Sequence, residues 1–517
     1  MPFFDFHCHP GLKPQFSKPT AKPSPWDAII AKLAITKGWT IRINSLFNEV
    51  LNSQSNLTQL VQNNVRMIGL ILHAPEQKIG QVLGEKGIVN KGKINLIDKT
   101  QLAYLTTGVH SFELINEELR WLTVAVSPIP GAKLKIVKKA SDFNEADQNT
   151  VFGVIIVEGL HCFFDDLNAP DAKEKYTKNF NKFTTENTVI SMNICHMQQN
   201  QFCNHAYGIQ LFNPALFYPT GNGITTWGNE IINSMVSKKI LVDIKHMSLK
   251  ARLDLYSKFR LPDPEPKYVQ PLVCTHAGTT GLPIIDRVKY IYKVPEDKDS
   301  VYELMHLKPK SRFYDDVYHN ASSINLYDED IEAIFLSEGI IGLSFDQRIL
   351  GFGDDSGETS VIVPHDLEYI SHDEASFFFG PTPANLHVWP DDTNVWASED
   401  LDALAQNQDL YPDLHRKFLI NNILHILWVA SKKPSIGLKK AAKQICIGTD
   451  FDGLINAIDC CKTADGLQKL KDDMRQELAR GLNKNGFQEL NVDTLLDDIF
   501  YNNGKNFMLK RLKEMKG

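Results

Sequence analysis

The sequence is short of cysteine and of long apolar runs. It has 8 cysteines in 517 residues, and none forms a Cys-x-x-Cys pair, so neither a disulfide framework nor a zinc ribbon is expected. No apolar stretch approaches the roughly 20 residues that span a bilayer. The first residues also lack the basic and apolar regions of a signal peptide. These absences predict a cytoplasmic protein with no membrane partner.

Basic charge is not in excess either. Lys and Arg number 55 against 62 Asp and Glu, which leaves a net charge of -7, and no basic run is present. A nucleic-acid partner is therefore not expected, because binding to phosphates needs a positive surface. With 43% hydrophobic residues the chain can bury a large core, and it contains no internal repeat. We expect one domain over residues 1–517, with the surplus length in insertions.

Short runs rich in β-branched residues recur eight times along the chain. Segments with helical periodicity separate them, among them 46–64, 225–239, 326–339 and 415–433. Alternating strands and helices predict a parallel sheet, and eight such units predict an α/β fold of the closed (β/α)8 TIM-barrel type. The eight predicted strands are 3–9, 65–74, 151–159, 188–196, 238–246, 269–276, 339–345 and 443–450.

Three long segments interrupt this pattern, each after the end of a predicted strand. They cover residues 11–45, 277–325 and 346–412 approximately, and they contain many aromatic residues. Loops of this length inside a compact protein are usually functional. We expect them to form lids on the C-terminal rim of the barrel.

Ionisable residues stand at the C-terminal ends of the predicted strands. Barrel active sites are built from this rim, so the set predicts an active site. In the opening stretch "DFHCHP", His7 and His9 would project to the same face of an extended strand, while Cys8 faces the other way. Further along the chain, the strand ends carry Glu158, His196, Asp243, His246, His276 and Asp450, together with His73, which we expect to be structural.

Imidazole and carboxylate ligands without thiolates suit Zn²⁺, Mn²⁺ or Fe²⁺ in a catalytic site, and of these divalent ions we expect zinc. Glu158 could bridge two ions about 3.5 Å apart, one bound by the histidines of the first strand and the other by His246 and His276. Such a pair lowers the pKa of a shared water and supplies hydroxide. Asp450 could accept the proton of that water, and His196 could stabilise the oxyanion. Asp452 either orients a ligand or serves as a turn residue in "DFDG".

The sequence resembles the membrane (renal) dipeptidases of the amidohydrolase superfamily and their bacterial relatives. The motifs that carry the resemblance are "VEGLH", "NICHMQQNQFCN", "VDIKHMS", "CTHAG", "IGTDFDG" and "NNGKNF". It implies a metallohydrolase with two divalent ions that cleaves a dipeptide or a similar small molecule. It also implies that Glu158 is the bridging carboxylate, that His246 and His276 bind the second metal, that His196 contacts the scissile group, and that Asp450 is the proton shuttle.

Two positions depart from the family pattern. The family has His-x-Asp in the first strand, where this chain has His7 and His9. The family also has an Arg-Asn pair that grips the substrate's terminal carboxylate, and the matching stretch "SSINLYDED" places Ile324 before Asn325. Either carboxylate recognition is lost, or an arginine of the insertions replaces the missing one. The candidates are Arg348, Arg287 and Arg312.

The leading interpretation is therefore a metal-dependent amidohydrolase that acts on a small-molecule substrate such as a dipeptide or an N-acyl amino acid. A TatD-type nuclease or phosphoesterase is the alternative enzyme, because it uses a similar residue set on a barrel, but the acidic composition argues against a phosphodiester substrate. A non-catalytic barrel that only binds a partner is the third interpretation. The sequence is compatible with a homodimer but does not determine the oligomeric state.

Overall fold

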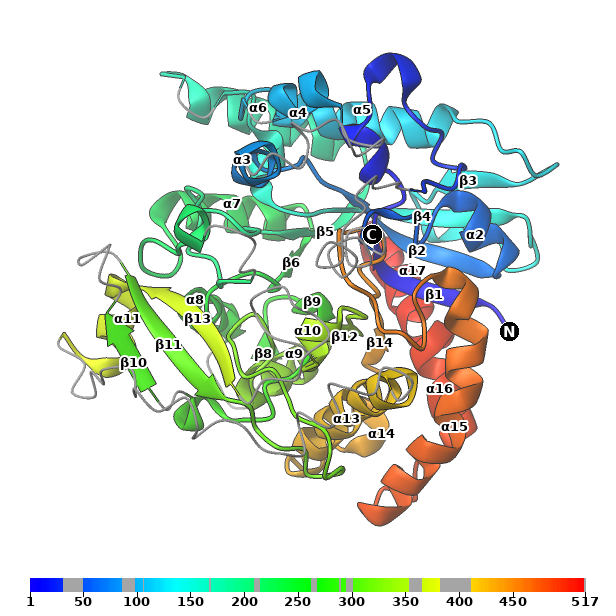
Figure 1. The fold of residues 1–517 in the computed structure, drawn as a ribbon, viewed down its shortest axis with the longest axis vertical. Helices are drawn as coiled ribbons and strands as arrows, with labels where there is room; N and C mark the ends of the chain where they lie inside the picture. The colour runs from blue at the N-terminus through cyan, green and yellow to red at the C-terminus, as the bar shows by residue number, and fades with distance from the viewer. Residues whose placement is uncertain are drawn as a thin grey trace, which may run out of the picture.

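The computed structural model describes residues 1–30, 50–85, 98–105, 107–166, 169–208, 214–261, 267–287, 290–293, 301–352, 365–381 and 411–515. The fold is a TIM-type (β/α)8 barrel, as the sequence predicts, and all eight predicted strands are present (Figure 1). The barrel strands, in spatial order, are β1 (Phe3–Cys8), β2 (Val65–Leu72), β4 (Thr150–Val157), β5 (Val189–Asn193), β6 (Leu241–Asp243), β9 (Val273–Ala277), β12 (Ile340–Leu343) and β14 (Ile445–Ile447).

Every strand pair along this path is parallel. A short extra strand, β3 (Lys133–Ile136), also pairs parallel with β4. The barrel closes between β1 and the residues that follow β14. At this seam the amide of Asp450 donates to the His7 carbonyl at 2.8 Å, and the amide of His9 donates to the Phe451 carbonyl at 2.9 Å. Closure therefore places the first and last predicted site residues side by side.

Helices surround the barrel strands (Figure 1). The predicted helices over 225–239, 326–339 and 415–433 are confirmed, and the described part of 46–64 contains one helix near its end. The α-helices are α2 (Leu57–Gln62), α3 (Gln77–Glu85), α4 (Lys99–Leu105), α5 (Ser111–Val124), α6 (Ala172–Glu186), α7 (Thr226–Ser237), α8 (Leu249–Phe259), α9 (Asp328–Leu336), α10 (Gln347–Leu350), α11 (His372–Phe379), α13 (Tyr411–Ser431), α14 (Leu438–Ala441), α15 (Leu467–Lys484), α16 (Val492–Asp497) and α17 (Asn503–Glu514).

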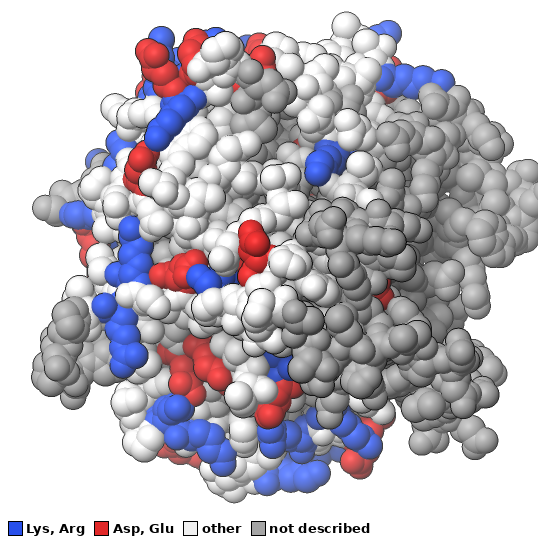
Figure 2. Space-filling model, turned by 90° about the vertical axis from the view of Figure 1, so that its left-hand side faces the viewer, with Lys and Arg blue, Asp and Glu red and all other residues white. Residues whose placement is uncertain are grey.

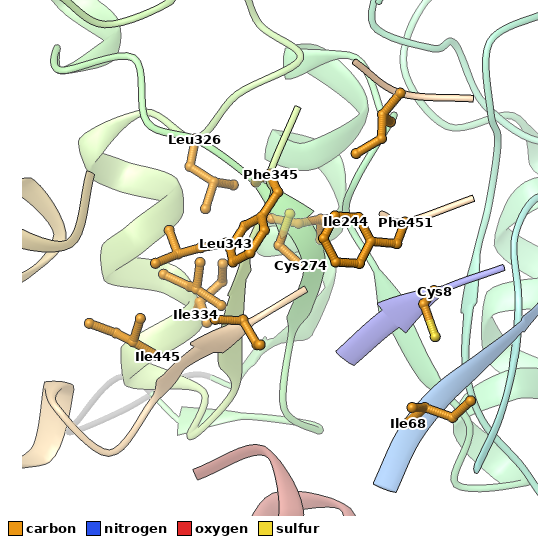
Figure 3. Packing of buried hydrophobic residues seen from close by; sticks show 14 of the residues in the cluster. Cys8, Ile68, Ile244, Cys274, Leu326, Ile334, Leu343, Phe345, Ile445 and Phe451 are labelled. Atoms are coloured by element: carbon orange, nitrogen blue, oxygen red, sulfur yellow. The ribbon is translucent and has the colours of Figure 1, made fainter. Parts of the chain in front are cut away.

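Two apolar layers hold the barrel together. Its interior contains apolar side chains from all eight barrel strands, for example Phe6 of β1 and Ile340 of β12. Met508 of α17 joins this interior cluster, and Gly504 lets α17 approach the Phe4 ring, where a Cβ would collide. A second, larger cluster lies between strands and helices, and Figure 3 shows part of it. The "NNGKNF" motif thus packs the last helix against the barrel.

Three strands form a separate antiparallel sheet beside the barrel (Figure 1). They are β10 (Tyr290–Lys293), β11 (Val301–Leu307) and β13 (His365–Ser371). They come from the described parts of the second and third predicted insertions, whereas 31–45, 288–289, 294–300, 353–364 and 382–410 lie outside the described residues. A two-stranded ribbon of β7 (Arg260–Leu261) and β8 (Lys267–Tyr268) follows α8.

On the face drawn in Figure 2, the described acidic and basic side chains are interspersed. None of the helices in the described part of the chain is long and apolar enough to cross a membrane.

Candidate metal centre

Four histidines and two carboxylates meet at the C-terminal rim of the barrel. His7 lies in β1, Glu158 directly follows β4, and His276 lies in β9. His246 lies three residues beyond β6, where Ser248 caps α8 by accepting a hydrogen bond from the Ala251 amide. Because the strands are parallel, their ends collect on one rim. His9 and Asp450 complete the group through the seam between the first and last strands.

The two histidines of the first strand converge on Glu158. Their Nε2 atoms are 3.0 Å apart. His7 Nε2 lies 3.4 Å from Glu158 Oε1, and His9 Nε2 lies 3.4 Å from Oε2. Cys8 belongs instead to the apolar layer outside the barrel (Figure 3).

The second histidine pair approaches the same carboxylate. His246 Nε2 and His276 Nε2 are 3.2 Å apart, and they lie 3.3 and 3.6 Å from Glu158 Oε1. Ligand atoms at zinc bonding distances around a tetrahedral ion are separated by roughly 3.3–3.4 Å. All these side chains are buried. The donor set could therefore hold divalent metal ions, and the group formed by His7, His9 and Glu158 is one of several candidate metal-binding groups among the described residues.

The Thr275 hydroxyl and the Asp243 carboxylate orient His7. His7 Nδ1 lies 2.8 Å from Thr275 Oγ1, and the Thr275 hydroxyl donates to Asp243 Oδ2. A hydroxyl has one proton, so Thr275 accepts from the Nδ1–H of His7. This arrangement leaves the lone pair of His7 on Nε2, where a ligand atom is needed. The sequence placed Asp243 at the rim, and the structure gives it this supporting contact.

Asp450 lies beside the first histidine pair. Its Oδ1 atom is 3.3 Å from His9 Nε2 and 3.8 Å from His7 Nε2. Its backbone is left-handed, with φ of 64°, a conformation that Asp tolerates better than most residues. Burial raises the pKa of Asp450 to about 8, and the negative charges of Glu158 and Asp346 add to this effect. A carboxyl with such a pKa can exchange a proton near neutral pH.

His196 is held by a carboxylate that the sequence interpretation missed. Glu76 Oε2 lies 2.8 Å from His196 Nδ1, and Glu76 Oε1 accepts from the Met197 amide at 2.9 Å. The Nε2 atom of His196 faces Glu158 Oε1 at 3.8 Å. Burial alone would lower the pKa of His196, but the charges of Glu76 and Glu158 outweigh it and raise the pKa to about 9. Glu76 follows β2 by four residues, so only its position near a strand end could have drawn attention to it.

Two further rim residues, His73 and Asp452, contact the protein itself. His73 Nδ1 lies 2.9 Å from the Glu158 carbonyl oxygen, and its amide donates to Glu118 at 3.1 Å. Asp452 pairs with Lys13 at 2.7 Å and accepts from the Ser55 amide at 2.8 Å. Asp452 therefore ties the loop after β14 to residues that follow the first strand.

The residues expected to bind a substrate carboxylate are engaged with other groups. Arg348 pairs with Asp346 at 2.7 Å, and Arg312 lies over the Trp428 ring at 4.1 Å. Arg287 is buried, lies 3.7 Å from Glu368, and is 4.7 Å from the centroid of the Phe378 ring. Asn325 donates to the Ile349 carbonyl at 2.8 Å and accepts from the Gly278 amide at 3.0 Å.

A second residue missed in the sequence is Lys245. It lies between β6 and His246, it is buried, and its Nζ donates to the Ile324 carbonyl at 3.3 Å. The signal for it was its position inside the motif "VDIKHMS", directly before His246.

The chain thus belongs to the TIM-type barrels that carry a buried cluster of histidines and carboxylates on the C-terminal rim. No protein-family model matches the chain. No curated protein matches it either.

Solved structures of metallopeptidases match the chain over nearly its full length. One is a metallo peptidase from Rhodobacter sphaeroides liganded with a phosphinate mimic of the dipeptide L-Ala-D-Ala, with 14% identity, a TM-score of 0.49, and 99% of each chain covered. The dipeptidase AC, also a metallo peptidase, has 13% identity and a TM-score of 0.48, again with 99% of each chain covered. The probable dipeptidase PvdM from Pseudomonas aeruginosa has 13% identity and a TM-score of 0.47, with 100% of this chain and 96% of that chain covered.

Proposed function

We propose that the protein is a metal-dependent hydrolase that cleaves an amide bond in a small substrate, either a dipeptide or an N-acyl amino acid. One observation carries the proposal: two histidine pairs approach a single buried carboxylate at distances that suit shared metal ions. His7 and His9 would hold one ion, His246 and His276 would hold the other, and Glu158 would bridge them. Zinc is the ion we expect from this ligand set.

Two divalent ions bound in this way would lower the pKa of a water and polarise the scissile carbonyl. Asp450 lies beside the first pair, so its Oδ1 atom is placed to take a proton and return it to the leaving amine. His196, held through Nδ1 by Glu76, is placed to donate a hydrogen bond from Nε2 to the developing oxyanion. The sequence motifs add independent support, because they resemble those of the membrane dipeptidases, and we propose that family for the chain.

The first test combines metal analysis with turnover and uses Asp450→Asn. The purified protein should contain close to two divalent ions per chain and should hydrolyse a member of a panel of dipeptides and N-acyl amino acids. Asp450→Asn should keep the metal, because the two histidine pairs and Glu158 remain, but should lose at least about a hundredfold in kcat.

Asp373→Asn is the matched control, because Asp373 is an exposed carboxylate in the first turn of α11. A protein that binds no divalent ion would overturn the proposal. An Asp450→Asn variant with normal kcat would remove Asp450 from the role of proton carrier.

A further inference from the structure

Lys245 is a buried basic residue at the C-terminal rim of the barrel. The residue is only 2% exposed. Its ammonium has three N–H donors, and the contact with the Ile324 carbonyl at 3.3 Å uses one of them. No ion pair joins this ammonium to a carboxylate in the described part of the chain. Lys245 thus differs from the buried lysines Lys13 and Lys308, which pair with Asp452 at 2.7 Å and with Asp366 at 3.2 Å.

The surroundings place the ammonium near the metal centre. Ile324 belongs to a loop that pairs with the residues after His276, since the Leu326 amide donates to the Gly278 carbonyl at 3.1 Å. The positive charge of Lys245 acts to lower the pKa of His246, His276 and Asp450. The amine therefore lies within electrostatic reach of both the second histidine pair and Asp450.

A buried ammonium in this position needs an anion. Removing an ammonium from water is unfavourable unless a negative charge compensates it. Divalent ions on Glu158 would add repulsion. Arg348 does not need a further anion, because Asp346 already neutralises its charge. Burial lowers the pKa of Lys245, and the charges of Asp450, Asp346 and Asp243 oppose this, but none of these described carboxylates forms an ion pair with its ammonium.

We propose that Lys245 binds a carboxylate of the substrate and so selects substrates with a free acid group next to the scissile amide. This inference rests on the proposed function. The side chain of Ile324 packs with Ala206 and Ile349, so at this position it is the backbone carbonyl that holds the amine. A lysine is a point charge and does not need the paired geometry of an arginine. The two free N–H groups of Lys245 remain for the carboxylate.

The test compares L-Ala-L-Ala with its C-terminal amide, using the metal-loaded protein and the variants Lys245→Met, Lys245→Arg and Arg348→Met. The wild type should have a kcat/KM at least about tenfold higher for the free acid, as expected when a charge-assisted hydrogen bond is lost. Lys245→Met should bring this ratio close to one, mainly through KM for the free acid. Lys245→Arg should restore part of the ratio, and Arg348→Met should keep it.

Binding gives a readout that does not depend on turnover. Calorimetric titration of the slow Asp450→Asn variant with the two peptides should show a preference for the free acid, and adding Lys245→Met should remove it. Metal content measured on every variant separates loss of the carboxylate contact from loss of metal.

The results that would contradict the role of Lys245 differ from those that would contradict the proposed hydrolase activity. Equal kcat/KM for both peptides in the wild type, or an unchanged ratio in Lys245→Met, overturns the role of Lys245 and leaves the hydrolase intact. A ratio abolished by Arg348→Met also overturns it. If the wild type hydrolyses neither peptide, the proposed activity on dipeptides fails, and the calorimetric preference alone decides the role of Lys245. If Lys245→Met does not fold, the wild-type ratio and Lys245→Arg decide it.

Discussion

Glu76 and Glu118 are buried carboxyl groups on either side of His73, and their pKa values shift in opposite directions. Burial raises the pKa of Glu118 to about 8, and the hydrogen bond from the His73 amide only partly opposes this. Burial also disfavours the charge on Glu76, but the charge of His196 and its hydrogen bond outweigh burial and hold the pKa of Glu76 well below its usual range. At neutral pH, Glu76 is therefore ionised, and Glu118 is mainly protonated.

Glu76→Gln should lower kcat about tenfold to a hundredfold, a typical cost of losing the partner that orients a site histidine. The amide can still accept from the Met197 backbone, so the fold should persist, while His196 loses the charge that fixes its ring and its protonation. The measurement is kcat and KM over a range of pH. A structural role alone would lower stability without changing the pH profile.

Glu118→Gln is the control for this variant, because it replaces a carboxyl that is already mostly neutral. It should leave kcat within about twofold. Equal losses of kcat in the two variants would contradict a specific role for Glu76.

At the scale of elements, strand β13 holds the loop that carries Ile324. Glu368 of β13 accepts from the Ser323 amide at 3.1 Å and lies 2.9 Å from His306 Nε2 of β11. Despite burial, the His306 hydrogen bond and the charge of Arg287 hold the pKa of Glu368 at about 2. The separate sheet is thus joined by ionic and hydrogen-bonding contacts to the loop that positions Lys245.

Glu368→Gln should destabilise this region and weaken substrate binding. It removes the negative charge from a buried group that includes Arg287, and breaking such a buried pair costs about 3 kcal/mol. We expect a lower midpoint in urea and a KM raised several-fold, with a smaller change in kcat, because the proposed metal ligands lie on the barrel strands or just beyond them.

The neighbouring Glu303→Gln on β11 serves as the control. Burial already raises the pKa of Glu303 toward the neutral form, so the substitution should change less. An unchanged KM in Glu368→Gln would show that the sheet does not position the substrate loop.

At the scale of the whole molecule, the metal centre joins strands that are distant in the sequence. Its proposed ligands come from β1, β4, β6 and β9 or from the residues just beyond them, and the seam with β14 adds Asp450. Ions bound to this set would stabilise the closed barrel, because the unfolded chain does not bring the ligands together.

Removal of metal with a chelator should therefore lower Tm by several degrees. At a free metal concentration of about 100 times Kd, binding contributes about 2.7 kcal/mol to the free energy of unfolding. His9→Ala should show a smaller response to the chelator and a lower metal content. His372→Ala, which changes an exposed histidine on α11, should respond like the wild type. A Tm that does not depend on metal in the wild type would contradict this coupling.

The sequence allowed the barrel and most of the candidate centre to be predicted for a simple physical reason. Strands buried on both faces read as short apolar runs, and a parallel barrel collects the ends of these runs on one rim. His7, Glu158 and His276 could thus be grouped although they are far apart in the chain. Glu76 and Lys245 could not, because Glu76 stands in the loop after β2, and Lys245, although next to His246, looks like an ordinary charged residue.

The sequence by itself determined the order of strands and helices and the types of ligand at the strand ends, because both follow from local hydrophobic periodicity and residue chemistry. Only the tertiary structure decided which charges are neutralised. Arg348 faces Asp346, Glu368 lies beside Arg287, and Lys245 faces a backbone carbonyl. Those pairings depend on how the loops fold back over the rim, and the energy of a buried charge depends on its neighbours in space.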